Sequence, residues 1–487
     1  MSIRDKAVKG IVWSAIENWG SQAGSLLVFF VLARLLKPEA FGLVAFASIF
    51  LAFMQIFLNQ GFAQALVQRR ELDPEHLDTA FWTNLTIGVA LTLIGYTSAS
   101  PIAQLFRQPE LAPILQGFSL LCIITAFGNV QQAILERNLA FRAIALRSLL
   151  GTLVGGCVGL IAAISGLGVW SLVYQQIVQE LVGTVMLWRA SNWRPGLKFS
   201  LPHLQHLFGF GISLLGFNLL NFLNTRADDF LIGYFLGPVP LGYYTIAYRI
   251  LSVMTQVLLS AGTKVALPTF SRLQQDPEQF RQAFHTATQL TSVVAFPIFL
   301  GMTVLAPEFV VLFFGSQWTP SIPVLQVLSL AGIFKAVAFF KGSVFIAMGK
   351  PIWTFWFGLL NATLNLAGFA IAIRWGIVAV ACAYVIRGYL VLPISQWFVS
   401  RLIQISFFKY FHNFFIPLIS SLIMVTVMLM TKFFLSQLLN QQMLLAVCIA
   451  IGIFSYGLVL RWLSPKLFLK LQEFLNIVLT RSKAQNI

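Results

Sequence analysis

The sequence predicts an all-α integral membrane protein with about 14 transmembrane helices. Of its 487 residues, 58% are hydrophobic and only 10% are charged, and the mean hydropathy is +0.82. Soluble domains contain about 25% charged residues, so this composition excludes a soluble globular protein. Fourteen spans of about 21 residues each would take about 294 residues. The remaining residues form the tails and the connections, and they are too few for a soluble catalytic domain.

Apolar runs separated by polar breaks give the positions of the spans. They lie at about residues 11–33, 41–64, 80–103, 112–134, 146–166 and 169–189 in the first half, at about 207–235, 241–268, 283–305, 323–347, 353–373 and 376–398 in the second half, and at about 413–435 and 443–463 after it. The strongest internal break is the polar connection 189–202. We therefore predict one lobe over residues 1–195, a second lobe over 196–400, and two last helices with a basic tail over 401–487.

The first span begins in a way that resembles a secretory signal peptide. Arg4, Lys6 and Lys9 precede a long apolar stretch, as in the charged first region of such a peptide. However, the stretch is too long for a signal peptide, and it contains Glu17 and Asn18. We therefore expect an uncleaved first helix that enters the membrane from the cytoplasm.

The distribution of Lys and Arg predicts the sidedness of the chain. With both termini in the cytoplasm, 22 of the 32 Lys and Arg fall in cytoplasmic segments, Arg147 among them, 5 fall in outer connections and 5 fall inside spans. Cytoplasmic loops of membrane proteins contain such an excess. The formal net charge of +16 therefore indicates topology and not nucleic-acid binding.

The two halves of the chain match one another at an offset of 200 residues. Six of nineteen positions are identical: Leu36 and Leu236, Pro38 and Pro238, Gly42 and Gly242, Ala47 and Ala247, Leu51 and Leu251, and Met54 and Met254. Because each half has an even number of spans, the second half begins on the same side as the first. This is a parallel repeat about an axis along the membrane normal. Two such lobes can rock about a central cavity, and a static scaffold or channel is the alternative.

Several cations are expected inside the spans, where each would cost about 2.5–3.5 kcal/mol near the centre of a helix that faces lipid. They are Arg226, Arg249, Lys335, Lys341 and Arg387. They should therefore face the protein interior, where they outnumber the acidic residues. Such an excess favours an anionic ligand, because Arg offers paired N–H donors to phosphate oxygens and Lys offers a point charge. A diphosphate headgroup fits this chemistry, and a carboxylate or an acidic sugar is not distinguished from it.

Acidic residues share these spans and are candidates for coupling transport to a proton or sodium gradient. They are Glu17, Glu180, Asp228 and Asp229, and the ion is left open. Arg226 and Asp229 are three residues apart and can share a helix face, so a local ion pair is the alternative role for them. In the helix expected over 323–347, six residues at about 100° each turn Lys341 about 120° away from Lys335. These two cations then need not line one surface.

No metal, cofactor or disulfide site is predicted. Cys122, Cys157, Cys382 and Cys448 each lie alone in an apolar stretch, and we interpret them as small apolar side chains. His203 and His206 have a loosely ligand-like spacing, but no acidic, His or Cys residue lies close to them in the sequence.

A family resemblance is visible in the middle of the chain. Residues 228–249, DDFLIGYFLGPVPLGYYTIAYR, resemble the central signature of bacterial polysaccharide transporters, the Wzx-type lipid-linked oligosaccharide flippases of the MOP exporter superfamily. Supporting segments are LARLLKPEAFG at 32–42, LPTFSRLQQDPEQFR at 267–281, VLAPEFVVLFFGSQW at 304–318 and AMGKP at 347–351. The resemblance covers nearly the whole chain. It is greatest to the branch that exports colanic or teichuronic acid-like repeat units.

The resemblance implies two six-helix lobes with two further helices, and movement of undecaprenyl-diphosphate-linked oligosaccharide repeat units from the cytoplasmic to the outer leaflet of the bacterial plasma (inner) membrane. The repeat units would serve surface polysaccharides such as exopolysaccharide, O-antigen or capsule, and the mechanism would be alternating access. Arg226, Asp228, Asp229 and Arg249 lie in or next to the matched signature. The resemblance also implies that related lipid II flippases use arginines in the first helix. This chain has Glu17 and Asn18 there, which disfavours a peptidoglycan precursor.

The expected partners are the lipid-linked oligosaccharide, membrane lipids and, as a further candidate, the polysaccharide polymerase machinery. No nucleic acid and no cofactor are expected, and the chain is expected to act as a monomer.

Two other functions were weighed. A cation-coupled small-molecule exporter of the same superfamily would favour a smaller and more acidic cavity, which the excess of cations disfavours. A membrane enzyme such as a polysaccharide polymerase or ligase would need a sizeable outer loop with Arg, His or acidic groups. The longest expected outer connection, 306–322, contains one acid, Glu308, and no cation or histidine. We therefore expect no enzyme.

Overall fold

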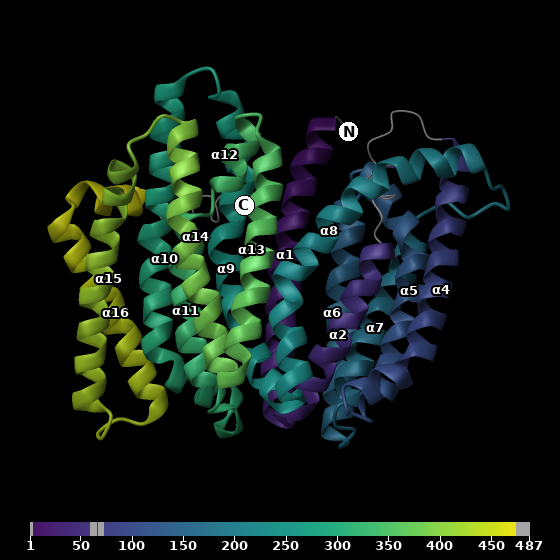
Figure 1. Cartoon of the computed structure of the whole chain (residues 1–487), viewed down its shortest axis with the longest axis horizontal. Coiled ribbons are helices and arrows are strands. Elements are labelled where there is room, and N and C mark those ends of the chain that lie inside the picture. The colour runs from purple at the N-terminus through teal and green to yellow at the C-terminus, as the bar shows by residue number, and fades with distance from the viewer. Residues whose placement is uncertain (1–2, 59–65, 67–72, 474–487) are drawn as a thin grey trace. The chain divides into compact units, whose positions relative to one another are not determined.

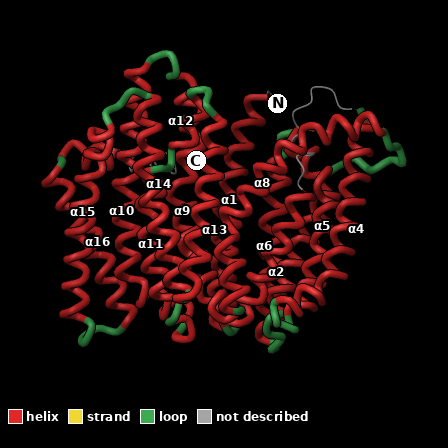
Figure 2. The backbone as a smooth tube through the Cα atoms, viewed as in Figure 1, coloured by secondary structure: helices red, strands yellow, loops and turns green. Residues whose placement is uncertain are grey.

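The computed structural model describes residues 3–58, 66 and 73–473, apart from some helical side chains, those of 206–214 among them. In these ranges every regular element is helical and no strand occurs (Figure 2). The all-α part of the predicted fold class is therefore confirmed.

By packing, the chain divides into two compact units, Met1–Thr245 and Ile246–Ile487 (Figure 1). The first unit contains α1 (Ile3–Leu35), α2 (Pro38–Leu58), α4 (Pro74–Leu105), α5 (Leu111–Arg137), α6 (Phe141–Ile164), α7 (Trp170–Ala190), α8 (Leu201–Leu236) and the start of α9 (Pro238–Arg272). The second unit contains the rest of α9, α10 (Pro277–Phe314), η1 (Ser316–Trp318), α11 (Ser321–Val337), α12 (Lys341–Ala347), α13 (Pro351–Ala372), η2 (Ile373–Trp375), α14 (Ile377–Leu402), α15 (Phe407–Leu435) and α16 (Gln441–Leu463). The predicted lobes 1–195 and 196–400 follow from the polar connection 189–202 and not from packing, and they stay a prediction.

Each expected span falls on one of these helices, except that the tenth falls on α11 and α12; residues 59–64 of the second span lie outside the described residues. In the described ranges, ten helical segments are long and apolar enough to cross a membrane, and α11 with α12 forms one of them. The remaining long helices, α1, α7, α8 and α9, contain more polar residues, such as Gln175, Gln179 and Glu180 of α7. Such a helix crosses a membrane only when its polar groups face other helices or water. The number of about 14 spans remains a prediction.

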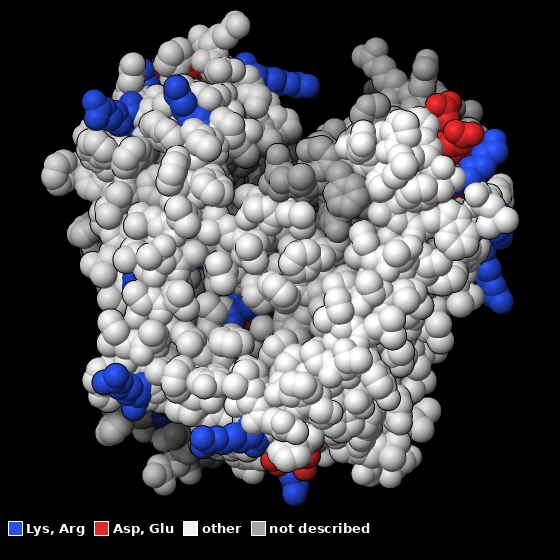
Figure 3. All heavy atoms as spheres, turned by 45° about the vertical axis from the view of Figure 1, so that its right-hand side comes forward, with Lys and Arg blue, Asp and Glu red and all other residues white. Residues whose placement is uncertain are grey.

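The charged side chains are unevenly distributed along the helices. On the face drawn in Figure 3, Lys, Arg, Asp and Glu lie mostly toward the helix ends, and a broad band of other residues separates them. Large apolar side chains are exposed in this protein, including Phe433, Phe454 and Ile453, each at least two-thirds exposed. An exposed apolar band between two charged rims is the surface that a bilayer requires.

In the first unit, small residues permit close helix packing. α6 packs along α7, and α1 packs against α6. Gly151, Gly155 and Gly159 form a stripe on α6. A Cβ at Gly151 would lie 2.8 Å from the Gln179 carbonyl oxygen, and one at Gly155 would lie 2.7 Å from that of Gln175. Glycines spaced by four residues allow two helix backbones to approach in this way.

The second unit differs from the prediction at the end of the ninth span. We expected this span to end at residue 305 and an outer connection to cover 306–322. Instead, α10 continues to Phe314, and Glu308 is buried with a carboxylate oxygen 2.7 Å from the Lys432 Nζ of α15. The residues around Glu308 are apolar, so the helix continues through them. The ion pair with Lys432 stabilises the Glu308 carboxylate in place of the water that it would have met in a loop.

The tenth span was expected to be one continuous helix over 323–347, and this is wrong. α11 ends at Val337 and α12 begins at Lys341. The turn between them directs Phe340 into the core, where its ring centre lies 6.1 Å from that of Phe270. The helical angle that we calculated between Lys335 and Lys341 therefore does not apply.

The matched prolines and glycines of the repeat have equal roles in the first unit. α2 begins at Pro38 and α9 begins at Pro238. A Cβ on Gly42 would overlap the Pro238 carbonyl oxygen, and a Cβ on Gly242 would overlap the Pro38 carbonyl oxygen. A reciprocal contact of this kind is what elements related by a two-fold axis make.

Replacing Gly42 or Gly242 with Ala should force the first turns of α2 and α9 apart. We expect each change to lower the free energy of unfolding by about 1–3 kcal/mol, the usual cost of overpacking, measured as a lower Tm of the purified protein. Gly457→Ala is the control, because a Cβ there meets no atom within 4 Å. A wild-type Tm in both Gly42→Ala and Gly242→Ala would show that the crossing does not need glycine.

Candidate functional site

Two cations of the second unit share one tyrosine ring. The Lys335 Nζ of α11 lies 5.5 Å from the ring centre of Tyr384 and 5.9 Å from that of Tyr248. The guanidinium carbon of Arg387, on α14, lies 5.0 Å from the Tyr384 ring centre. The negative face of an aromatic ring attracts a cation. Tyr384 therefore holds the cations of two packed helices close together.

A third cation, Lys341 of α12, approaches the same part of α13 as Arg387. The Arg387 Nη1 donates to Asn361 Oδ1 at 2.6 Å. Asn361 is one helical turn from Phe357, and the Lys341 Nζ lies 5.0 Å from the Phe357 ring centre. The side chains of Lys341 and Arg387 thus meet at one turn of α13. We call Lys335, Lys341 and Arg387 the cation cluster.

The cation cluster has aromatic and amide neighbours. In the part of the chain that the structure describes, no Asp or Glu oxygen lies within 4.0 Å of the Lys335 or Lys341 ammonium group. Ring faces stabilise Lys335 and Lys341 without cancelling their charge. The arrangement can bind an anion with point charges from Lys and paired donors from Arg.

Arg249, another predicted cavity cation, lies on the part of α9 that belongs to the second unit. Its side chain is exposed. The preceding residue, Tyr248, has its ring beside Lys335, so α9 passes next to the cation cluster at this level. Sequence spacing alone did not indicate that α9 and α11 meet here.

In the first unit, the remaining predicted cation forms an ion pair within its own helix. The Arg226 Nη1 lies 3.1 Å from Asp229 Oδ2, which is the local pair that we considered as an alternative. Asp228 is buried and accepts hydrogen bonds from the Tyr244 hydroxyl at 2.8 Å and from the Asp229 N–H at 3.0 Å. Asp228 therefore joins α8 to the first turns of α9.

A second polar network of the first unit joins four helices. Glu17 of α1 accepts a hydrogen bond from the Ser148 hydroxyl of α6 at 2.7 Å. The preceding residue of α6, Arg147, has its Nη2 3.6 Å from Glu180 of α7 and donates through Nη1 to Gln132 of α5. Two of the predicted coupling acids, Glu17 and Glu180, thus meet neighbouring residues of α6.

Arg147 is a residue that sequence reasoning placed differently. We counted it among the cytoplasmic cations because it falls at the edge of the expected span 146–166. α6 begins earlier, at Phe141, so Arg147 lies inside the helix and faces α7. Two features of the sequence could have indicated this pair. A cation stands near the start of a glycine-rich span, and the next span along the chain contains one acid.

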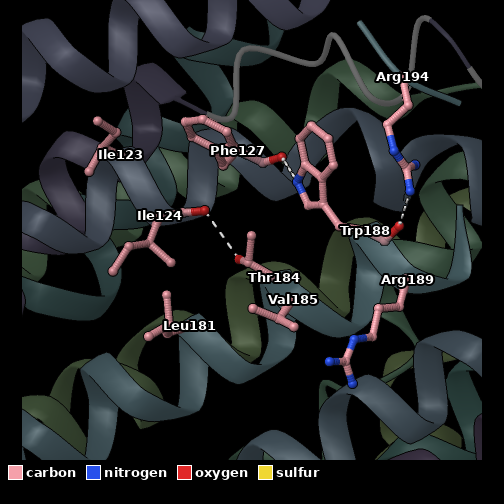
Figure 4. A pocket seen from close by; sticks show the side chains of 9 residues that line it. All are labelled: Ile123, Ile124, Phe127, Leu181, Thr184, Val185, Trp188, Arg189 and Arg194. Carbon is pink, nitrogen blue, oxygen red and sulfur yellow. Dashed lines mark hydrogen bonds between the residues drawn. The ribbon is translucent and has the colours of Figure 1, made fainter.

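An apolar groove lies between α5 and α7 and has two arginines at one end (Figure 4). Its volume is about 610 Å³, and it is lined by Ile123, Ile124, Phe127, Leu181, Thr184, Val185, Trp188, Arg189 and Arg194. The Trp188 Nε1–H donates to the Phe127 carbonyl oxygen at 2.9 Å. Arg194 lies 5.5 Å over the Trp188 ring. The groove can hold a hydrocarbon chain whose anionic end reaches the guanidinium groups.

Residues 31–323 match the family model described as polysaccharide biosynthesis protein. The chain belongs to this family. It is 31% identical to the succinoglycan biosynthesis transport protein ExoT of Rhizobium meliloti, over 86% of this chain and 85% of that one. It is 27% identical to the teichuronic acid biosynthesis protein TuaB of Bacillus subtilis, over 93% and 95%, and 28% identical to the lipopolysaccharide biosynthesis protein WzxC of Escherichia coli, over 83% and 82%.

Solved structures share the fold. The lipid II flippase MurJ in an inward closed conformation has a TM-score of 0.77 and 17% identity, over 94% of this chain and 99% of that one. An inward-facing multidrug resistance MATE family transporter of the MOP superfamily has a TM-score of 0.59 and 17% identity, over 78% and 94%. At this identity the likeness concerns the fold alone.

Together these findings confirm the predicted family. The protein is a multi-pass membrane transporter of the Wzx-type polysaccharide biosynthesis family, and it is not an enzyme.

Removing the Tyr244 hydroxyl tests the structural role of Asp228. Tyr244→Phe leaves one oxygen of a buried carboxylate without its donor, which should lower the free energy of unfolding by about 1–3 kcal/mol, measured by thermal unfolding in detergent. Tyr174→Phe, at a ring that is 41% exposed, should leave the Tm unchanged. Equal Tm values for the two variants would contradict the proposed bond.

Proposed function

We propose that this transporter moves undecaprenyl-diphosphate-linked oligosaccharide repeat units from the cytoplasmic to the outer leaflet of a bacterial plasma membrane, for export of a surface polysaccharide. The proposal rests on the cation cluster. Three cations meet in one bundle of membrane helices, where each costs several kcal/mol unless it has a partner or water. An anionic group that spends part of the transport cycle between them would offset that cost.

A diphosphate suits the cation cluster better than a carboxylate does. A diphosphate ester has at least two negative charges and several acceptor oxygens, whereas a carboxylate has one charge. Arg387 can donate two parallel N–H groups to phosphate oxygens, while Lys335 and Lys341 supply point charges. The hydroxyls of Tyr248 and Tyr384 add donors and acceptors that can meet the hydroxyls of a sugar. Arg226 and Arg249 remain further candidates for substrate contact.

The groove between α5 and α7 supports the second expected partner, membrane lipid. Its walls are apolar, and Arg189 and Arg194 lie at one end, which matches an acyl chain with a phosphate headgroup. The tail of the transported lipid stays in the bilayer in this proposal. The polysaccharide polymerase machinery remains a candidate partner, and we propose a monomer with both termini in the cytoplasm.

Alternating access between two six-helix lobes, 1–195 and 196–400, is the mechanism we propose, with 401–487 adding two helices. The reciprocal contact of Gly42 with Pro238 and of Gly242 with Pro38 supports a parallel two-fold repeat, which lobes that rock against each other require.

The acidic residues Glu17, Glu180, Asp228 and Asp229 are the candidates for ion coupling. A small-molecule exporter that binds cations is disfavoured, because the cation cluster would repel such a substrate.

Substitution of the cation cluster tests the substrate. In cells that lack the flippase for a surface glycan, wild-type protein should restore the polymer. Arg387→Ala should reduce export by about tenfold or more, the equivalent of one lost charge-assisted hydrogen bond of about 1.5–3 kcal/mol. Membrane abundance should not change.

Arg374→Ala is the matched control, because Arg374 is an exposed cation of the same unit, outside the cation cluster. Liposomes with purified lipid-linked oligosaccharide complete the test, since a flippase changes the leaflet of the product and leaves its mass unchanged. Full export by a triple alanine variant of the cation cluster would refute this assignment.

Glu180→Gln tests coupling separately from substrate binding. The change keeps the side-chain size and removes the charge that faces Arg147. If Glu180 couples transport to an ion gradient, gradient-driven accumulation in liposomes should fall while exchange without a gradient persists. Glu278→Gln, which removes the acid of an exposed pair with Arg281, should behave like wild type. Unchanged gradient-driven transport in Glu180→Gln would exclude Glu180 as a coupling residue.

A further inference from the structure

The connection that precedes α8 is held against the start of α4 by a set of hydrogen bonds. The Gly196 N–H donates to Asp78 Oδ1 at 2.9 Å, and the Trp82 Nε1–H donates to the Gly196 carbonyl oxygen at 2.7 Å. The Ser200 N–H donates to the Thr79 hydroxyl oxygen at 3.1 Å. These bonds fix the entry into α8, and with it the position of the residues in the first turn of that helix.

The fixed entry places His203 beside two possible metal ligands of α4. The ring centres of His203 and His76 lie 3.7 Å apart, and the Asp73 Oδ2 lies 3.6 Å from His76 Nδ1. One ligand atom from each of these three residues lies within 4.8 Å of the other two. The ligand-like spacing in the sequence pairs His203 with His206, whose side chain lies outside the described part of the chain. The partners found here are more than a hundred residues away in the sequence.

The burial of one ring nitrogen of His203 also indicates a missing partner. His76 is only 4% exposed. The Nδ1 atom of His203 is buried and has no hydrogen-bond partner among the residues that the structure describes. A buried ring nitrogen without a partner costs free energy comparable to a lost hydrogen bond. A bound metal ion would remove that cost.

The second unit provides a natural comparison for Asp73. The motif Asp-Pro-Glu starts α4 at Asp73 and α10 at Asp276. At α10, Asp276 caps the helix and accepts the Gln279 N–H at 3.0 Å. At α4, Asp73 makes no such side-chain cap, and its carboxylate lies beside His76, the counterpart of Gln279. The same motif therefore caps the helix in the second unit, whereas in the first unit its carboxylate lies beside a histidine.

We propose that Asp73, His76 and His203 bind a divalent transition-metal ion, and that Zn²⁺ fits them best. Two imidazole nitrogens and one carboxylate oxygen are ligands that Zn²⁺ prefers, at about 2.0–2.2 Å. The three ligand atoms already lie within 4.8 Å of one another, and the Asp73 side chain is exposed, so it can turn toward an ion. Three protein ligands leave a fourth position for water. The ion ties the start of α8 to the start of α4.

Metal titration of the purified full-length protein tests the site. Tag-free protein in detergent is stripped with a chelator and titrated with Zn²⁺ by calorimetry, and with Co²⁺ by visible absorption. We expect one saturable site per chain and a higher Tm with Zn²⁺. His76→Gln and His203→Gln should each weaken binding by at least about tenfold, since even a neighbour that only supports a ligand is worth 10–100-fold.

Two variants serve as matched controls. Asp276→Asn changes the cap of the corresponding motif in α10, and His412→Gln removes an exposed histidine of α15. Neither should alter Zn²⁺ affinity, whereas Asp73→Asn should weaken it. X-ray absorption of the Zn²⁺-loaded wild type supplies a test that does not depend on variants, and it should show two imidazole ligands. Absence of a saturable site, or wild-type affinity in both His76→Gln and His203→Gln, would overturn the proposal.

Discussion

Helices α2 and α9 cross at their first turns, and this crossing depends on two residues that lack a side chain. At Gly42 and Gly242 each helix presents bare backbone to the carbonyl oxygen of the other helix's first proline. No larger residue fits there, because a Cβ would overlap an oxygen that is itself fixed by the start of a helix. The crossing also places α8 against α2. Tyr244, two residues after Gly242, donates its hydrogen bond to Asp228 of α8 beside this crossing.

Charge inside the membrane is stabilised in two different ways. In the first unit, Arg147 and Arg226 each face a carboxylate, so the charges are paired within the protein. In the second unit, Lys335 and Lys341 lie over ring faces, which leave the positive field largely intact. A transporter of anions needs both arrangements. Ion pairs lower the free-energy cost of charged residues in a membrane helix, and cations that lie over aromatic rings remain available to a ligand.

Much of the fold follows from local features of the sequence. Apolar runs placed all the long helices, because the need to satisfy backbone groups in lipid leaves few other structures. The repeat was visible because Pro38 and Gly42 recur at Pro238 and Gly242. The break between α11 and α12 and the continuation of α10 were not visible, since both depend on packing against helices distant in sequence. For the same reason the contacts of His203 with α4 could not be predicted.

The shared contact of Lys335 and Arg387 with Tyr384 has an energetic consequence. Any ligand that draws one of these cations from the ring changes the local field felt by the other. The two side chains are therefore coupled, and their contributions to affinity will not add as independent increments. The ring makes two neighbouring helices respond together to a single bound charge.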